Sequence, residues 1–278
     1  MTTQPAAQRE RSIRDYFQKL IEHWGPQDWW PAHTRFEVIL GAYLTQNTAW
    51  TNVERALRNL RLEGLLNLQG VRGASLPELE RLVRPAGYFR QKAQRLKNFV
   101  RYLDERHEGS LTRMFSRPTR ELREQLLELN GVGPETADSI LLYAGGHPVF
   151  VVDAYTRRIF ERHGVLTGEE KYEEVRELFE RAFHQEAAGR WQEARFRPRS
   201  ALPGKKRRKF TLRSAPERAE VFDEYHALLV QVAKNHCLKK AALCQGCPLE
   251  RFLPPGGARQ ARAIKKAGSQ KKPASMRG

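Results

Sequence analysis

The chain has 278 residues, of which 40% are hydrophobic and 29% are charged, so it is long and apolar enough to bury a sizeable core. No apolar run approaches the roughly 20 residues that a membrane helix requires, and the start of the chain lacks the apolar segment of a secretory signal. These features predict a cytoplasmic protein without membrane contact. The formal net charge of +17 favours a polyanionic partner, and composition alone leaves DNA, RNA and anionic lipid open.

Apolar residues recur at three- and four-residue steps through most of the chain, which predicts helices. These segments are Phe36–Leu44, Val53–Leu60, Leu96–Leu103, Leu122–Leu129, Ile140–Tyr143 and Phe222–Val232. No sustained alternation marks a sheet, and the short run Val149–Val152 is interpreted as a buried connection. We therefore predict an all-α fold with two helical lobes. One lobe comprises residues 1–33 and 151–253, and the other comprises residues 34–150.

The positive charge is concentrated in two segments. Between Arg190 and Arg213 ten Lys and Arg residues stand against one acid, and from Pro254 to Gly278 seven stand against none. We interpret residues 187–218 as a basic insertion and residues 254–278 as a disordered basic tail. Flexible cationic segments strengthen non-specific phosphate binding, and they also occur as solvated loops without a dedicated role.

A tight glycine turn between two helical patterns is formed by Asn130, Gly131, Val132, Gly133 and Pro134. The glycines allow the backbone to bend and to approach a ligand, and the proline suits the first turn of the next helix. Free amides at a helix N-terminus favour a phosphate, so we expect this hairpin to clamp a DNA backbone. Taken alone, such a turn also joins many helix pairs that bind no phosphate.

A carboxylate follows the hairpin at the start of another helical pattern. Asp153 comes directly after the apolar run Val149–Val152 and before the apolar pair Ile159 and Phe160. An acid in that position is most simply an N-cap, which satisfies free amides of the first turn.

Together these segments resemble the endonuclease III superfamily of DNA glycosylases, which are helix-hairpin-helix proteins of base-excision repair. The resemblance rests on Leu129-x-Gly-Val-Gly-x-x-Thr-Ala followed by Val-Asp153 before a helix, and it covers roughly Trp29 to Cys247. It implies that Asp153 is the catalytic carboxylate, which stabilises the oxocarbenium-like sugar and orients or deprotonates the attacking water. One residue can serve as both cap and catalyst.

One departure from the motif bears on mechanism. Strand-nicking members of the family carry a lysine immediately before the Thr-Ala pair, where this chain has Glu135. A carboxylate cannot form the Schiff base that a lysine amine forms with the opened sugar, so we predict a monofunctional glycosylase. Another lysine remains an alternative. We assign Glu135 to the active site beside Asp153, and its other interpretation is a favourable acid in the first turn of a helix.

Aromatic residues near the start resemble the 3-methyladenine glycosylase branch of this superfamily. Trp29, Trp30 and Pro31 precede Phe36, and Gln46 ends the helical pattern that Phe36 begins. The resemblance implies that Trp29, Trp30, Pro31 and Phe36 line a pocket for the extruded base. It also implies that Gln46 enters the DNA helix. Alkylated purines carry positive charge, which aromatic faces attract. Aromatic side chains in a helical protein are otherwise most often core.

The three cysteines, Cys237, Cys244 and Cys247, fall within eleven residues. Their spacing matches the first three ligands of the family's [4Fe–4S] loop, but Leu253 stands where the fourth cysteine is expected. Three interpretations stay open: a cluster with an unusual fourth ligand, a zinc site completed by His236, or a loop without metal.

The leading hypothesis is a monofunctional glycosylase that hydrolyses the N-glycosidic bond of alkylated purines in duplex DNA. An endonuclease III-like glycosylase and AP lyase for oxidised pyrimidines is the alternative within the same class. A non-catalytic helix-hairpin-helix DNA-binding protein is the alternative from another class. In each case we expect a monomer that binds double-stranded DNA and is associated with the nucleoid.

Overall fold

The computed structural model describes residues 4–27, 32–183 and 217–260. The regular backbone of these ranges is helical, and its one ladder contact is an isolated antiparallel bridge between Cys237 and Ala242. The predicted all-α class is therefore confirmed. Within the same ranges, none of the helices combines the length and the apolar character that crossing a bilayer requires.

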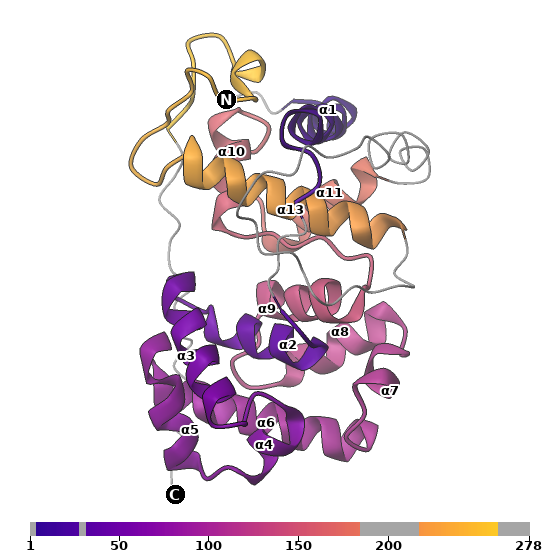
Figure 1. Ribbon diagram of the computed structural model, residues 1–278. Helices are drawn as coiled ribbons and strands as arrows, with labels where there is room; N and C mark the ends of the chain where they lie inside the picture. The colour runs from indigo at the N-terminus through magenta and orange to yellow at the C-terminus, as the bar shows by residue number, and fades with distance from the viewer. Residues whose placement is uncertain (1–3, 28–31, 184–216, 261–278) are drawn as a thin grey trace, which may run out of the picture.

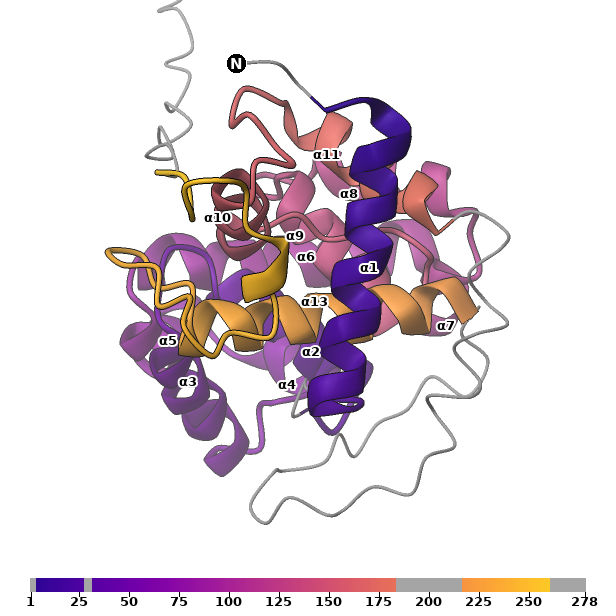
Figure 2. The ribbon, with the colours of Figure 1, turned by 90° about the horizontal axis from the view of Figure 1, so that it is seen from above.

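The helices form two groups, one above the other in Figure 1. The upper group comprises α1 (Ala6–Trp24), α10 (Ala154–Arg162), α11 (Tyr172–Ala182), α13 (Glu217–Asn235) and the short turn η3 (Glu250–Phe252). The lower group comprises α2 (Arg35–Leu44), α3 (Trp50–Leu62), α4 (Leu68–Gly73), α5 (Leu76–Val83), η1 (Arg84–Ala86), α6 (Phe89–His107), α7 (Leu111–Phe115), α8 (Thr119–Glu128), α9 (Pro134–Ser139) and η2 (Ile140–Gly145). Figure 2 shows α1 lying across α13.

Helix α2 is the central helix of the lower group. Its residues from Phe36 to Leu44 are all buried, and it packs against α3, α6 and η2. A helix that is largely apolar on every side is stable only when other elements surround it. Thr34 begins the helix by accepting a hydrogen bond from the Glu37 N–H at 3.1 Å. The end of α2 carries Gln46 towards the hairpin.

The segment predicted to be helical at Ile140–Tyr143 begins the π-helix η2, which continues directly from α9. The wider turn of a π-helix is uncommon and is frequently found near functional sites. Here η2 contacts both α2 in the lower group and α13 in the upper group. It therefore joins the two groups at the level of the hairpin.

Aromatic rings pack in the upper group around the connection between η2 and α10. Phe150 stacks on Phe179 with ring centroids 4.2 Å apart, and it also contacts Phe222 and Tyr225. All four residues of Val149–Val152 are buried, which confirms the prediction of a buried connection. The start of α10 is thus anchored in the core.

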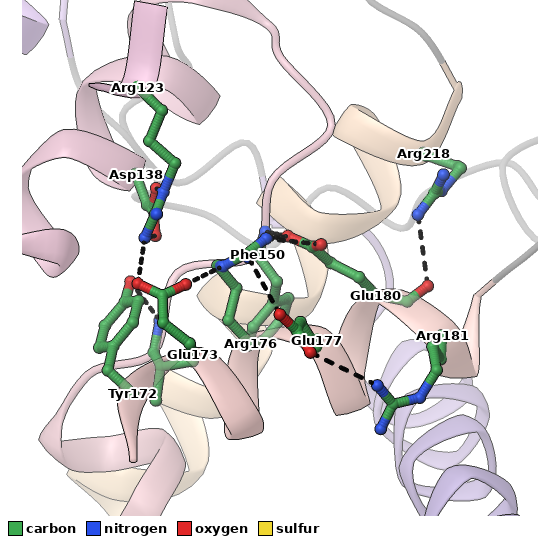
Figure 3. A network of polar contacts seen from close by, with 11 residues as sticks. Arg123, Asp138, Phe150, Tyr172, Glu173, Arg176, Glu177, Glu180, Arg181 and Arg218 are labelled. Carbon is green, nitrogen blue, oxygen red and sulfur yellow. Dashed lines mark hydrogen bonds and ion pairs between the residues drawn. The ribbon is translucent and has the colours of Figure 1, made fainter. Parts of the chain in front are cut away.

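A network of ion pairs connects the two groups (Figure 3). Arg123 on α8 donates to both carboxylate oxygens of Asp138 on α9, at 2.6 and 3.1 Å, and to Glu173 Oε1 on α11 at 2.7 Å. Arg176 links Glu173 to Glu180 along α11. Asp138 is completely buried, so Arg123 supplies the opposite charge that a buried carboxylate requires. This network fixes α8 and α9 to α11.

The two predicted basic segments lie mostly outside the described residues. Of the insertion predicted at 187–218, only residues 217 and 218 are described, and they begin α13. Of the tail predicted at 254–278, the described part ends at residue 260. In that part the Arg259 N–H donates to the carbonyl of Arg162, the last residue of α10, at 2.9 Å.

Candidate active site

Asp153 is the N-cap of α10. Its Oδ1 accepts hydrogen bonds from the backbone N–H groups of Tyr155, at 3.0 Å, and Thr156, at 2.8 Å. Its Oδ2 lies 3.4 Å from Nε2 of His226 on α13. The carboxylate therefore has one oxygen fixed by α10 and the other directed at a buried imidazole.

The surroundings of Asp153 favour its ionised form. Burial by itself raises the pKa of a carboxyl group, but His226 and the hydrogen bond from Thr156 outweigh burial and lower the pKa of Asp153 below its usual value. The side chain of Asp153 is still 14% exposed, so solvent reaches it. An ionised carboxylate with access to water is what a base-assisted hydrolysis requires.

Glu135 lies in the first turn of α9, and its surroundings favour the neutral form of its carboxyl group. As a residue Glu135 is exposed to solvent, yet neighbouring protein atoms still partly bury its carboxylate. That burial, together with the negative charge of Asp153, raises the pKa of Glu135 to about 7, against smaller opposing contributions from His226 and Arg157. The two acids therefore differ in charge near neutral pH, a pattern typical of sites that use two carboxyl groups in different roles.

The two glycines of the hairpin serve different purposes. Gly131 has a φ of +80°, which favours glycine, and a Cβ built on it would displace the guanidinium of Arg95. Gly133 has an ordinary φ of −97°, and no atom lies within 4 Å of a Cβ built on it. Gly131 therefore permits the turn, whereas Gly133 leaves the outer surface of the hairpin without a side chain at that position.

Gln46 connects the end of α2 to this hairpin. Its Nε2 donates to the Gly131 carbonyl and to Thr136 Oγ1, both at 2.9 Å, and its Oε1 accepts from Arg95 at 2.6 Å. The structure thus brings together Gln46 and the hairpin residues that the sequence predicted separately. In the protein alone, the side chain of Gln46 is held against the hairpin.

Residues 40–185 match the family model of the HhH-GPD superfamily base excision DNA repair proteins. The chain belongs to this superfamily. The protein MJ1434 of Methanocaldococcus jannaschii, provisionally named a DNA repair glycosylase, is 42% identical over 242 residues, which cover 86% of this chain and 94% of MJ1434. The resemblance drawn from the hairpin and Asp153 is therefore confirmed.

Solved structures of the HhH-GPD fold superpose on most of this chain. The 3-methyladenine DNA glycosylase MagIII of H. pylori, solved with 1,N6-ethenoadenine, gives a TM-score of 0.64 at 26% identity and covers 83% of this chain and 98% of its own. Endonuclease III in a non-covalent DNA complex gives a TM-score of 0.63 at 19% identity, with 89% of this chain and 96% of its own covered. The second likeness concerns the fold alone.

Of the predicted base-pocket residues in this HhH-GPD protein, Trp29, Trp30 and Pro31 lie outside the described residues. Phe36 is described, and its buried ring packs beside Phe99 with centroids 6.5 Å apart, inside the core of the lower group. That position agrees with the core interpretation of an aromatic side chain, and a pocket role for Phe36 stays a prediction.

The flanks of the aromatic segment are both anchored. On one side, the backbone N–H of Gln27 donates to the carboxylate of Glu224 on α13. On the other side, the backbone N–H of His33 donates to Glu37 Oε2 on α2 at 2.9 Å. The described residues on the two sides of residues 28–31 therefore contact α13, through Glu224, and α2, through Glu37.

Lys92 bears on the alternative that another lysine serves as a nucleophile. Its side chain is buried, and its Nζ donates to the carbonyls of Leu44 at 2.8 Å and Ala86 at 2.7 Å. Burial and the neighbouring charge of Arg95 lower its pKa to about 8. Lys92 therefore closes the C-terminal end of α2, and its amine is occupied by the backbone.

The cysteine loop does not fit a four-thiolate cluster. Leu253 occupies the fourth position, and the described residues contain no group of three or more His, Cys, Asp or Glu side chains placed to share a metal ion. Instead, the buried guanidinium of Arg162 donates to Cys237 Sγ at 3.2 Å and to backbone carbonyls of the loop, among them Leu238 at 2.8 Å. The His236 ring stacks with Trp24 at 6.2 Å between centroids.

Two residues of the site were not predicted from the sequence, His226 and Arg95. In the sequence, His226 lies within an apolar helical pattern and is indistinguishable from a core histidine. Arg95 is one of 49 basic residues, so its charge gives no signal of its own. Only the packing of α13 and α6 against the hairpin and Asp153 identifies them.

Proposed function

We propose that this HhH-GPD protein is a monofunctional DNA glycosylase that removes alkylated purine bases from duplex DNA. The observation that carries the proposal is a solvent-accessible Asp153, capped by α10 and facing His226, together with Glu135 at the position where strand-nicking relatives carry lysine. The name of MagIII, a 3-methyladenine DNA glycosylase, supports the same substrate class.

In the proposed reaction, the bond between C1′ and the base nitrogen breaks and its electron pair leaves with the base. A cationic alkylated purine becomes neutral in this step, so no acid is needed to protonate the leaving group. Asp153 stabilises the positive charge that develops on the sugar and accepts one proton from the water that attacks C1′. The products are the free base and an abasic site in an intact strand.

The proposed role of Glu135 is electrostatic. When ionised, its carboxylate favours a cationic base over a neutral one, because opposite charges attract strongly in a partly desolvated site. A carboxylate also leaves no amine at this position for a Schiff base with the sugar. Both effects point to alkylated purines and to hydrolysis by water.

The proposed DNA contacts follow from the hairpin. The segment from Asn130 to Pro134 binds a phosphate through backbone amides, and the bare surface at Gly133 lets the strand approach. Gln46, adjacent to the hairpin, fills the space of the extruded base. Trp29, Trp30, Pro31 and Phe36 are proposed to form the base pocket.

We also propose a monomer whose cysteine loop is stabilised by Arg162 and contains no metal. One chain supplies Asp153, Glu135 and the hairpin, so the reaction needs no partner chain. The hydrogen bonds of Arg162 hold Cys237 and its neighbours in place. Light scattering of the purified protein together with iron and zinc analysis tests both statements, and one equivalent of either metal would contradict the second.

Incubation with methylated duplex DNA tests the proposed activity. We expect release of 3-methyladenine, with strand breaks appearing only after treatment with alkali. Strand breaks without alkali, on DNA with oxidised pyrimidines, would favour the endonuclease III-like alternative. Binding to duplex DNA without release of any damaged base would leave the non-catalytic alternative.

A further inference from the structure

Asp153 contacts a residue that lies far from it in the sequence. His226, in the middle of α13, is 5% exposed, and its Nε2 lies 3.4 Å from Asp153 Oδ2. The His226 ring also packs beside Tyr143 of η2, with centroids 5.8 Å apart. The imidazole is thus held between the π-helix and the carboxylate.

The two oxygens of Asp153 have separate environments. Oδ1 is occupied by the backbone N–H groups of Tyr155 and Thr156, whereas the residue directed at Oδ2 is His226. The two N–H groups belong to α10 itself, whereas His226 belongs to α13. Among these contacts, His226 is therefore the one from another helix that can fix the rotation of the carboxylate about its Cβ–Cγ bond. A helix cap alone would hold Asp153 in the same way in a protein without any catalytic activity.

We propose that His226 is a positioning residue for Asp153, and that it orients Oδ2 towards the attacking water. This inference rests on the proposed catalytic role of Asp153.

The charges around His226 define the expected effect of pH. Asp153 faces it from the start of α10 and Tyr143 from η2, while Glu135 on α9 interacts electrostatically with His226, with Asp153 and with Arg157 of α10. Burial raises the pKa of Asp153, and the largest opposing contribution comes from His226. Removal of His226 therefore raises the pKa of Asp153, so a larger share of the enzyme has a neutral, inactive Asp153 at mildly acidic pH.

The test compares His226→Leu and His226→Gln with the parent by single-turnover release of 3-methyladenine between pH 4.5 and 8.5. We expect His226→Leu to lower the rate about 10- to 100-fold near pH 6, because an oriented group contributes on that scale. We also expect its acid limb to move to higher pH. His226→Gln retains a neutral donor and should recover part of the rate with a smaller shift of the limb.

A matched control is His107→Gln in α6. His107 is also buried, and its Nε2 lies 2.9 Å from the hydroxyl of Tyr102 in the lower group. Its substitution should lower the melting temperature without moving the acid limb. If His226→Leu fails to fold, His226→Gln carries the test, with DNA affinity measured by fluorescence anisotropy as evidence of folding.

Asp153→Asn separates the two proposals. If Asp153→Asn is inactive while folded variants of His226 match the parent in both rate and acid limb, the positioning role is overturned and the proposed function stands. If Asp153→Asn releases bases as fast as the parent, the proposed function fails, and the role of His226 fails with it.

Discussion

Two motifs of the same family meet the two ends of α10, and they have different outcomes. At the N-terminal end, Asp153 follows the hairpin with the expected spacing and has the environment of an ionised carboxylate. At the C-terminal end, the cysteine spacing is retained at three of four positions, and the side chain of Arg162 supplies the hydrogen bonds that hold the loop. The comparison shows that the spacing of a motif can be retained in part while one expected ligand, here at Leu253, is replaced, so a motif must be judged by what its residues contact.

The largest expected effect is that of Asp153→Asn at the N-terminal end. Asparagine caps a helix as well as aspartate does, so folding should be unchanged, while base release from methylated DNA should fall by at least about 1000-fold. Single-turnover assays and thermal melts measure the two properties. Asp153→Ala, which lacks the cap, should additionally lose about 1 kcal/mol of stability.

Arg162→Met tests the C-terminal end. Loss of the buried guanidinium leaves Cys237 and several loop carbonyls without their donor, so we expect a loss of about 2–3 kcal/mol, or roughly 5–10 °C in melting temperature. Cys244→Ser, the matched control in the same loop, should cost less than about 1 kcal/mol. If both substitutions lower the stability equally and Cys244→Ser also releases a bound metal, the loop is a metal site. The contrast between the two ends of α10 would then disappear.

The two glycines of the hairpin allow a second comparison, within one motif: Gly131 is needed for the backbone conformation, and Gly133 keeps the outer surface free of a side chain. Gly131→Ala should lose about 1–2 kcal/mol in chemical denaturation, since alanine is strained at a φ of +80° and displaces Arg95. Gly133→Ala should change stability by less than about 0.5 kcal/mol but weaken binding to duplex DNA. An unchanged DNA affinity for Gly133→Ala would count against a phosphate at the hairpin.

The effect expected for Glu135→Gln on stability is modest, and it depends on pH. The pKa of Glu135 is raised from its ordinary value to about 7, so its neutral form favours folding at low pH and this contribution is lost as the pH rises through about 7. Glu135→Gln should therefore melt with the parent at pH 5 and about 2–4 °C higher at pH 8, with solvent screening limiting the gain. A difference that is the same at both pH values would show that the charge of Glu135 is not the cause.

The sequence was most informative where function depends on neighbours in the chain. The hairpin and the cap at Asp153 are local motifs, and so are the helical periods, so their positions followed from spacing. His226 and Arg95 depend on the packing of α13 and α6, which no local pattern specifies. The apolar residues at Ile140–Tyr143 indicated a helix but not its π-helical form. Because all of them are buried, their spacing does not distinguish one helical period from another. Phe36 lies in the core, as general burial preferences expect.

The ion-pair network of Arg123, Asp138 and Glu173 bears on how a damaged base reaches the site. Because Asp138 is fully buried and shares Arg123 with α11, rotation of one group of helices against the other would strip a desolvated charge of its counterion. A hinge at this point is therefore costly. Under the proposed function, we therefore expect α8 and α9 to keep their position against α11 when DNA binds, and we expect the deformation that brings a nucleotide to Asp153 to fall on the DNA.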